Sequence, residues 1–409
     1  MNLEKGKLVE KEIEHMLATD IIRPSKSEWA SPCVVVPKVV GSIRFCTDYR
    51  KVNAITKTDA YPIPRVDDCI NKVGRAKYIT KVGLLRGYWC LPLTDRAREI
   101  SAFVTPSGLC EYNVLPFGMK NAPGTFPRMI KSVIKGLKNT EAYIDDLVVW
   151  SDMWEEHIVA VGELFKRLSE ANLTVNLAKS EFSHAQVTYL GYVVGQGQLA
   201  PLQAKVQAIS KVPIPTDKRA LRRFLGMVGY YRKFCKNFAD ITLPLTKLLP
   251  KNAKFVWNDL CQQAFESLKA ILCHHPVLNA PDFSKPFSLA TDANDEAAGA
   301  VLLQTDKEEI DHPVAYFSKK FNVYQRNYST VEKELLAIIL ALQHLEVYIC
   351  PAWKPLVIYT DHNPFVFLAT MKDKNKRLLS WSLVLQEFDI RIKHIKGTDN
   401  VIADCLSRC

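Results

Sequence analysis

The N-terminal segment passes from a helical to an alternating hydrophobic pattern. Residues 3–18 carry apolar side chains, among them Val9, Ile13 and Met16, on one side of a helical projection, which predicts a short helix that ends before Pro24. The following segments VVVPK and IRFCTDYR lie on either side of a glycine and are typical of two strands in a hairpin. A helix next to a small sheet is therefore expected here.

A helix-rich interval is predicted from about residue 156 to 272, with one strand at 188–194. Within it, residues 219–234 have the sequence RALRRFLGMVGYYRKF, which is strongly basic with interleaved aromatic side chains. This composition suits contacts with phosphates and packing on bases or sugars, but a solvated helix with an apolar underside explains it equally well. The proline-rich residues 276–286 predict a domain linker.

Beyond the linker, strands and helices follow one another in a regular order. The strand patterns FSLATDA, GAVLLQ and PVAYFS precede a long helix, the strand PLVIYTD and another helix before the chain ends. Strands with helices packed on a mixed sheet predict an α/β layer domain that could fold alone.

Length and composition indicate packed domains without a membrane span. The 409 residues exceed what one hydrophobic core usually holds, and 48% of them are apolar while 24% are charged. The eleven cysteines include no CxxC pair, which predicts mainly buried free thiols in a reducing, intracellular protein. No signal peptide and no long apolar run is present, so neither secretion nor membrane insertion is expected.

The charge of the chain is unevenly distributed. The whole chain carries a formal charge of +11, whereas residues 286–409 have 14 basic and 16 acidic side chains and a net charge of −2. The remaining residues therefore carry +13. A basic body joined to a carboxylate-bearing end suggests that one part binds a polyanion and the other processes it.

Three aspartates of the C-terminal region stand where solvation alone does not explain them. Asp292 ends the strand FSLAT, Asp361 ends LVIYT, and Asp404 lies one turn after Val401 on the last helix. Sites on open α/β sheets are commonly built at the ends of strands. Taken singly, each of these residues is also explained by a cap or a surface ion pair.

The long predicted helix carries a carboxylate on its apolar face. Ser329 and Glu332 form a capping box for the helix STVEKELLAIILALQHL, so Glu332 already has a structural role. Glu334 instead falls close to Ile338 on the apolar side, where an unpaired carboxylate is costly. Four converging carboxylates suit Mg²⁺, and a two-metal site aligns the attacking water and the leaving oxygen of a phosphodiester.

The segment EAYIDDLVVWS carries two adjacent aspartates, Asp145 and Asp146, between apolar runs. This pattern predicts a tight hairpin that presents both carboxylates at its tip, as a metal platform for phosphoryl transfer would. Paired aspartates are also common in ordinary turns.

Several motifs occur in one order along nearly the whole chain. The segments RFCTDYRKVN, LPFGMKNAPGTF, YIDD and TYLGYVV resemble the reverse transcriptase of gypsy-type LTR retrotransposon Pol polyproteins. The segments TDANDEAAGAVL, YSTVEKELLAI, YTDHNPF and HIKGTDNVIADCLSR resemble the RNase H domain that follows it in that family. The resemblance implies an α/β and α+β multidomain fold, with a right-hand reverse transcriptase (fingers, palm and thumb) followed by an RNase H-like α/β domain. Neither a protease nor an integrase region is expected in this chain.

The resemblance also implies roles for individual residues. The metal ligands of RNase H would be Asp292, Glu334, Asp361 and Asp404, with His394 assisting catalysis. The metal ligands of the polymerase would be Asp145 and Asp146, and Arg44 would contact the phosphates of the incoming nucleotide. The nucleotide pocket would be lined by Tyr88, Phe117 and Gly118, with Tyr88 excluding a 2′-hydroxyl. The implied cofactor is Mg²⁺, and the implied partners are an RNA/DNA hybrid, a template-primer duplex and dNTPs, with dimerisation possible.

Gly83 departs from the family pattern. That pattern is close to YITKLDLLKGYW, whereas this chain has YITKVGLLRGYW, so Gly83 takes the place of a third, metal-bridging aspartate. Loss of such a ligand is expected to cost several kcal/mol of transition-state stabilisation, and each ~1.4 kcal/mol is a tenfold loss of rate. A glycine inside a strand also predicts a bulge or a close backbone approach. Val39, Val40 and Pro127, the last expected in the first turn of a helix, are further departures.

These observations lead to one main hypothesis for the domains and the activity of the chain. Residues 1–155 are predicted to form fingers and palm, 156–284 thumb and connection, and 285–409 the RNase H-like domain. We expect Mg²⁺-dependent cleavage of RNA in RNA/DNA hybrids to be retained and RNA-directed DNA polymerisation to be impaired. The alternatives are a retroelement-derived protein that only binds nucleic acid, and a structural C-terminal module whose carboxylates are caps. The expected location is intracellular, in the cytoplasm or the nucleus.

Overall fold

The structure is a computed structural model, which describes residues 3–37, 43–85, 87–105, 107–274, 276–352, 354–360 and 376–394. The chain divides into two compact units. The first comprises Met1–Arg65 and Lys77–Ala185, and the second comprises Val66–Ala76 and Gln186–Cys409. Helix α3, Val66–Val73, therefore belongs to the second unit although its neighbours in sequence lie in the first.

One sheet of the first unit has the strand order β1-β6-β5-β2-β3. Its strands are β1 (Ile22–Pro24), β2 (Ser31–Pro37), β3 (Ile43–Thr47), β5 (Phe103–Thr105) and β6 (Gly108–Tyr112), and the helices of this region are α1 (Leu3–Ala18), α2 (Arg50–Ile55) and α4 (Asp95–Ile100). Val9, Ile13 and Met16 of α1 are buried against Phe103 and Tyr112. The predicted N-terminal helix and the antiparallel hairpin of β2 and β3 are both confirmed.

The second sheet of this unit has the order β7-β8-β4-β9. Its strands are β4 (Tyr78–Leu84), β7 (Thr140–Tyr143), β8 (Asp146–Ser151) and β9 (Val175–His184), and they are accompanied by the 3-10 helix η1 (Gly87–Cys90) and by α5 (Ala122–Val133) and α6 (Trp154–Glu170). Phe126 of α5 and Leu164 of α6 are fully buried in one core with Val82 and Leu147 of the sheet. This core fixes the hairpin of β7 and β8 on the sheet.

Pro127 lies deeper in its helix than the sequence predicted. Helix α5 begins at Ala122, and the first intrahelical bond already runs from Thr125 N to Asn121 O. Pro127 therefore stands in the second turn and removes a backbone donor from the helix interior. The prediction of a first-turn proline was wrong, because Pro123 takes the first-turn place.

In the second unit, a small antiparallel sheet has the order β10-β11-β12-β13. Its strands are β10 (Val187–Tyr189), β11 (Tyr192–Gly195), β12 (Gln198–Pro201) and β13 (Leu278–Asn279), and the neighbouring helices are α7 (Gln203–Ser210), α8 (Lys218–Gly229), η2 (Arg232–Phe234), α9 (Phe238–Ile241), α10 (Leu243–Thr246) and α11 (Asp259–Cys273). The single strand predicted at 188–194 is in fact a hairpin. Leu190 and Gly191 both have positive φ and turn the chain between β10 and β11.

Three of the four aromatic side chains of the basic segment 219–234 are structural. Phe224, Tyr231 and Phe234 are buried and not available for packing on bases, whereas Tyr230 is 47% exposed and its hydroxyl donates to Leu190 O. Arg219 and Arg223, in contrast, are exposed on α8. The three buried aromatic side chains thus form the apolar underside of a solvated helical segment. The exposed arginines remain the candidates for phosphate contact.

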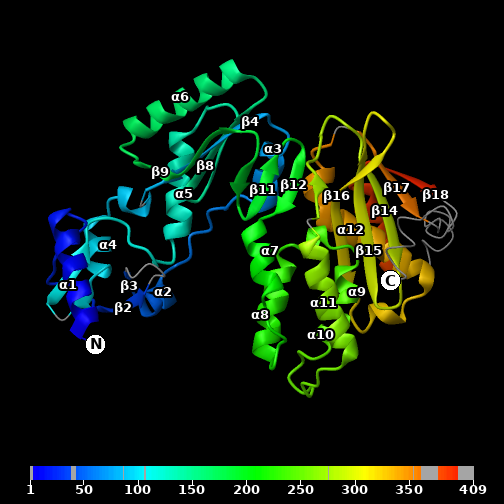
Figure 1. Cartoon of the computed structure of the whole chain (residues 1–409), viewed down its shortest axis with the longest axis horizontal. Helices are drawn as coiled ribbons and strands as arrows, with labels where there is room; N and C mark the ends of the chain where they lie inside the picture. Colours follow the sequence, from blue (N-terminus) through cyan, green and yellow to red (C-terminus); the bar gives the residue numbers. More distant parts are fainter. Residues whose placement is uncertain are drawn as a thin grey trace. The chain divides into compact units, whose positions relative to one another are not determined.

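The C-terminal sheet has the order β16-β15-β14-β17-β18, with α12 packed on one face (Figure 1). Its elements are β14 (Ser288–Ala293), β15 (Ala297–Thr305), β16 (Asp311–Lys320), η3 (Gln325–Asn327), α12 (Thr330–Ile349), β17 (Leu356–Thr360), α14 (Lys376–Gln386) and β18 (Ile390–His394). The predicted order of strands and helices is confirmed up to α14. Strand β18, which pairs in parallel with β17, was missed by the sequence analysis.

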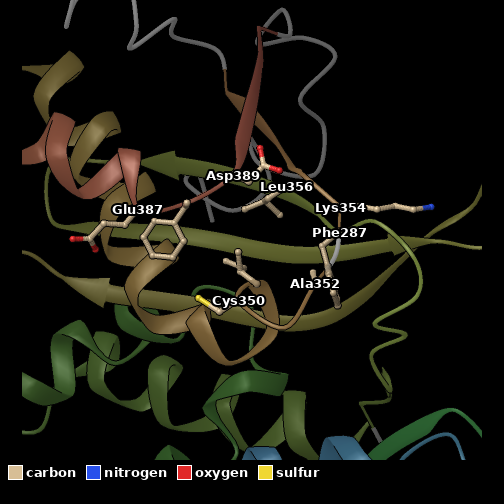
Figure 2. A pocket seen from close by; sticks show the side chains of 9 residues that line it. Phe287, Cys350, Ala352, Lys354, Leu356, Glu387 and Asp389 are labelled. Carbon is tan, nitrogen blue, oxygen red and sulfur yellow. The ribbon is translucent and has the colours of Figure 1, made fainter.

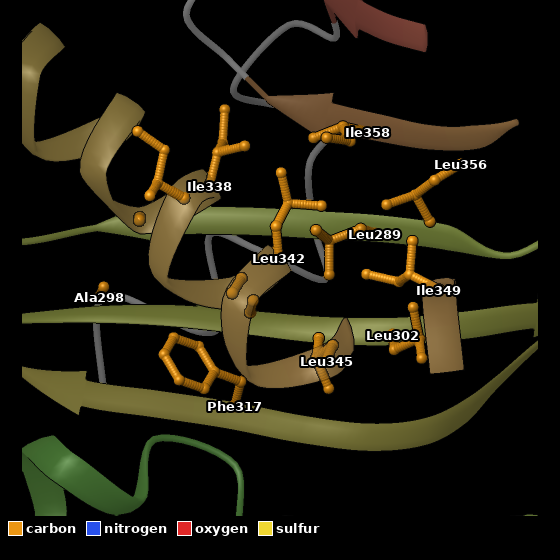
Figure 3. Close-up of a cluster of buried hydrophobic side chains, with 14 of the residues drawn as sticks. Leu289, Ala298, Leu302, Phe317, Ile338, Leu342, Leu345, Ile349, Leu356 and Ile358 are labelled. Atoms are coloured by element: carbon orange, nitrogen blue, oxygen red, sulfur yellow. The ribbon is translucent and has the colours of Figure 1, made fainter. Parts of the chain in front are cut away.

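The core of this region lies between α12 and the sheet. Figure 3 shows Ile338, Leu342 and Leu345 of the helix facing Leu289 and the neighbouring strands. Each of these side chains is almost completely buried, so the helix position is set by the hydrophobic effect. The capping box predicted at Ser329 and Glu332 is confirmed and fixes where the helix begins.

Within the part of the chain that the structure describes, no helix combines the length and the apolar character needed to cross a bilayer. All the cysteines in that part are free thiols, but only Cys69, Cys110, Cys235 and Cys261 are fully buried. Burial raises the pKa of Cys235 to about 12, as expected of an inert core thiol.

Candidate functional site

The hairpin of β7 and β8 brings the paired aspartates next to Gly83. Asp145 lies in the turn and Asp146 begins β8, after Ile144 has adopted a positive φ of 53°. Gly83 of β4 is the cross-strand partner of Asp146, and the amide of Leu84 donates to Asp145 O at 3.1 Å. The predicted carboxylate hairpin is confirmed as a structure, and its tip lies beside the glycine.

Burial raises the pKa of both aspartates above the ordinary range. For Asp145 the negative charge of Asp146 raises the pKa further, while Lys179 lowers it. For Asp146 the burial is opposed by the positive charges of Lys81 and Lys179. The buried Oδ1 of Asp145 has no hydrogen-bond partner among the described residues. Two partly buried carboxylates therefore lie side by side and rely on nearby lysines for charge compensation.

Strand β9 closely approaches Gly83. A Cβ atom placed on Gly83 would lie 3.3 Å from Cβ of Lys179 and 3.8 Å from its carbonyl oxygen. The amide of Gly83 donates to Ser180 Oγ at 3.3 Å, and the pairing of β4 with β9 is irregular at this point. The close approach expected from a glycine in a strand is thus observed. A larger residue fits only if β9 moves by a few tenths of an ångström.

Lys179, Lys81 and Glu181 were not singled out by the sequence analysis. Lys81 is largely buried and forms an ion pair with Glu181 across β4 and β9. The available signal was a lysine inside the apolar strand YITKVGL, where an unpaired charge is costly. Which residue would compensate it depended on the pairing of strands far apart in the sequence.

Two of the predicted nucleotide-pocket residues, Tyr88 and Phe117, lie near the carboxylate hairpin. The rings of Tyr88 and Phe117 meet edge to face, with centroids 5.0 Å apart. Tyr88 is buried, and burial together with the negative charge of Asp145 raises its pKa. Gly118 has a φ of +97°, and its carbonyl accepts a hydrogen bond from Asn53 Nδ2 at 2.9 Å. Arg44 belongs to β3, but its side chain lies outside the described residues.

The C-terminal sheet positions a second carboxylate site. Asp292 is the last residue but one of β14, and the next residue, Ala293, donates its amide hydrogen to Glu334 Oε1 at 3.1 Å. Glu334 is only 4% exposed, which confirms its predicted place on the apolar face of α12. The structure therefore brings the Glu334 carboxylate to the end of the strand that carries Asp292.

The other predicted residues of this site lie at or beyond the edge of the described chain. Asp361 and Asp404 are outside the described residues, although β17 ends at Thr360, directly before Asp361. The backbone of His394 ends β18, and its side chain is not described. Val39 and Val40 are also outside the described residues.

The residues of the two sites differ in how well they fit Mg²⁺. At the end of β14 the donor set consists of carboxylates, Asp292 and the Glu334 side chain that accepts from Ala293 N, and carboxylate oxygens suit a hard cation. At the hairpin, Gly83 supplies no donor atom, and Lys81 and Lys179 add positive charge. The hairpin residues do not fit a two-metal site. Within the described ranges, no three or more His, Cys, Asp or Glu side chains group closely enough to hold a metal.

A cavity of about 160 Å³ opens elsewhere on the C-terminal sheet, as Figure 2 shows. It is lined by Phe287, Ile349, Cys350, Ala352, Lys354, Leu356, Glu387, Phe388 and Asp389. Phe287 precedes β14 and Leu356 begins β17, so the cavity lies at the opposite end of these strands from Asp292. It is therefore separate from the carboxylate site.

Two sequence families match this chain. Residues 36–194 match the family described as reverse transcriptase (RNA-dependent DNA polymerase), and residues 282–388 match the RNase H-like domain found in reverse transcriptase. The chain thus contains a reverse transcriptase domain and an RNase H-like domain. It belongs to the retrovirus-related Pol polyproteins of gypsy-type LTR retrotransposons.

Three similar curated proteins are considerably longer than this chain. The Pol polyprotein from transposon 297 of Drosophila melanogaster is 39% identical over 408 residues, which cover 98% of this chain and 38% of that protein. The Pol polyprotein from transposon opus is 39% identical and the Tf2-3 polyprotein of Schizosaccharomyces pombe is 36% identical, with 42% and 30% of their lengths covered. The chain spans less than half the length of these relatives.

Solved structures support the fold. A foamy viral protease-reverse transcriptase in complex with ds DNA has a TM-score of 0.86, with 96% of this chain and 69% of that chain covered. The same kind of protein in complex with RNA/DNA hybrid has a TM-score of 0.83, with 97% and 54% covered. Both are 23% identical to this chain. The predicted fold class, a right-hand reverse transcriptase followed by an RNase H-like α/β domain, is confirmed.

Proposed function

We propose that this chain cleaves the RNA strand of RNA/DNA hybrids at the carboxylate site of its RNase H-like domain. One observation carries the proposal: the buried Glu334 carboxylate accepts a hydrogen bond from the amide next to Asp292. A carboxylate held at the end of the strand that carries Asp292 is placed to take part in metal-dependent hydrolysis of a phosphodiester.

The neighbouring residues hold and orient the carboxylates of this site. The backbone of Ala293 fixes Glu334 Oε1, while β14 holds Asp292 at the end of a strand paired on both sides. We infer that Asp361, Asp404 and His394 complete the set. Mg²⁺, when bound by these carboxylates, supplies the Lewis acid that activates water and stabilises the leaving 3′ oxygen.

RNA-directed DNA polymerisation is proposed to be impaired. Asp145 and Asp146 are present, and Tyr88, Phe117, Gly118 and Arg44 are the proposed nucleotide contacts, so a dNTP site is retained in outline. Gly83, however, contributes no carboxylate at the position opposite Asp146. The lysines around the pair further reduce the negative charge that divalent ions require.

Nucleic acid is the proposed partner of the whole chain. Support comes from the net charge of +13 on residues 1–285. The similar foamy viral proteins were solved with ds DNA and with RNA/DNA hybrid, which agrees with an RNA/DNA hybrid and a template-primer duplex as partners here. We also propose the division into fingers and palm (1–155), thumb and connection (156–284) and RNase H-like domain (285–409), an intracellular location and a possible dimer.

A paired assay tests the proposed function. Labelled RNA/DNA hybrid is followed for cleavage, and a labelled primer on the same template is followed for extension, each with Mg²⁺ and with excess chelator. The native chain is expected to cleave only with Mg²⁺ and to extend poorly, and Asp292→Asn is expected to abolish cleavage while it leaves hybrid binding in place. Hybrid binding without any cleavage by the native chain would favour a protein that only binds nucleic acid.

A further inference from the structure

The row of residues that contains Asp292 continues across the C-terminal sheet. Asp292 of β14 pairs with Gly299 of β15, and Gly299 pairs with Ser318 of β16. Adjacent strands lie about 4.8 Å apart, so Ser318 is about 10 Å from Asp292 along this row. Ser318 and the end of β14 are therefore connected across the sheet through one residue, Gly299.

Ser318 is bonded twice by residues that precede the RNase H-like domain. Arg232 of η2 donates from Nη2 to the carbonyl oxygen of Ser318 at 2.7 Å. The amide of Ala239 in α9 donates to Ser318 Oγ at 2.8 Å. Ser318 is only 5% exposed, so both bonds are shielded from water. They anchor the C-terminal part of β16 to the segment 232–240.

The same segment also contacts the turn that follows Asp292. Asn294 Nδ2 donates to Asp240 Oδ1 at 3.3 Å. Asn294 in turn shapes the turn between β14 and β15, because its Oδ1 accepts from the amides of Glu296 and Ala297 at 2.8 and 2.7 Å. Asp240 thus orients the side chain that closes this turn, two residues after Asp292.

We propose that residues 232–240 are a positioning element for the RNase H site, holding β14 across the sheet through Ser318 and along the chain through Asn294. The inference rests on the proposed function. Arg232, Ala239 and Asp240 act through other residues and do not touch the substrate. They make the sheet end that carries Asp292 more rigid, and misplacement by about 1 Å in an active site can cost up to about a hundredfold in rate.

The test uses the full chain with three variants. Asp240→Ala removes the acceptor for Asn294, Asp240→Asn keeps an oxygen acceptor of the same size, and Ser318→Ala removes only the acceptor for Ala239. Thr242→Val is the matched control, because Thr242 Oγ1 donates to the carbonyl oxygens of Phe238 and Ala239 in its own segment. Hybrid cleavage is measured as kcat and KM, and hydrogen exchange is measured by mass spectrometry over residues 292–299.

The expected result is a fall in kcat of about tenfold for Asp240→Ala with KM nearly unchanged, and faster exchange in the turn. Ser318→Ala should lower kcat in the same direction, while Asp240→Asn and Thr242→Val should resemble the native chain. Unchanged kcat and exchange in both Asp240→Ala and Ser318→Ala, in a native chain that cleaves, would overturn this inference and leave the proposed function standing. A native chain that does not cleave would overturn both.

Discussion

Gly83 of β4 and Asp146 of β8 face each other as a cross-strand pair. The side chain that is missing from Gly83 would therefore project beside the two adjacent carboxylates of the hairpin. Lys179 of β9 borders the same space, with its Cβ 3.3 Å from the place of the missing atom. This arrangement makes residue 83 the natural place to change the charge of the polymerase centre.

Gly83→Asp is expected to raise primer extension by at least about tenfold over the native chain. A third carboxylate would outweigh the positive charges of the nearby lysines, and each ~1.4 kcal/mol of transition-state stabilisation gained is a tenfold gain in rate. The measurement is single-turnover extension of a labelled primer with Mg²⁺. Gly83→Asn is the matched control, since it has nearly the same size without the charge and requires the same small shift of β9. Equal extension by the two variants would refute the ligand argument.

Glu334→Gln is expected to lower hybrid cleavage by about a hundredfold or more while thermal stability changes little. The amide oxygen of glutamine still accepts from Ala293 N, but the negative charge is lost. Glu332→Gln, on the same helix, is the control: glutamine can still complete the capping box of α12 but loses the ion pair with Arg377, so this variant should lower stability by at most about 1 kcal/mol and leave cleavage intact. Cleavage unaffected by Glu334→Gln would remove the central support of the proposed function.

Arg219→Gln combined with Arg223→Gln is expected to weaken binding of an RNA/DNA hybrid. If both exposed arginines contact phosphates, the slope of log K against log salt should decrease by about 1 to 2. Fluorescence anisotropy at several salt concentrations measures it. Lys307→Gln with Lys354→Gln removes the same charge from other exposed positions, and an equal effect there would mean that only net charge matters.

The buried His157 should make the first unit less stable in acid. Its Nε2 lies 2.8 Å from Thr80 Oγ1 and its Nδ1 lies 3.0 Å from Ser151 Oγ, and burial lowers its pKa below the ordinary 6.5. As pH falls below 6.5, the unfolded chain binds the proton first. The free energy of unfolding therefore decreases by up to ~1.4 kcal/mol per pH unit until the pKa of the folded state is reached.

The comparison of native chain and His157→Gln in urea unfolding between pH 7.5 and 5 measures this contribution. The native chain should lose more stability on acidification than the variant. His274→Gln, at an exposed histidine, should retain the native pH dependence. A native and a His157→Gln chain with the same pH dependence would show that His157 is not the group responsible.

Local patterns determined most of the elements. The capping box at Ser329, the apolar face that holds Glu334 and the hairpin at Asp145 follow from the spacing of a few residues along the chain. Where short-range signals were weak, the sequence misled. Gly191 was the one sign of a turn within an otherwise strand-like segment, so a hairpin was taken for one strand. Strand β18 was missed because it has only five residues, in which two isoleucines alternate with basic side chains.

The sequence by itself determined the class of this protein, because its motifs, their order and the position of Gly83 can be compared residue by residue with a known pattern. Only the tertiary structure decided which charges surround the two sites. Lys179 reaches Gly83 through the pairing of β4 with β9, and Asp240 reaches the turn after Asp292 through the contact of α9 with the C-terminal sheet. Such neighbours are set by long-range packing, which places residues together whatever their separation along the chain.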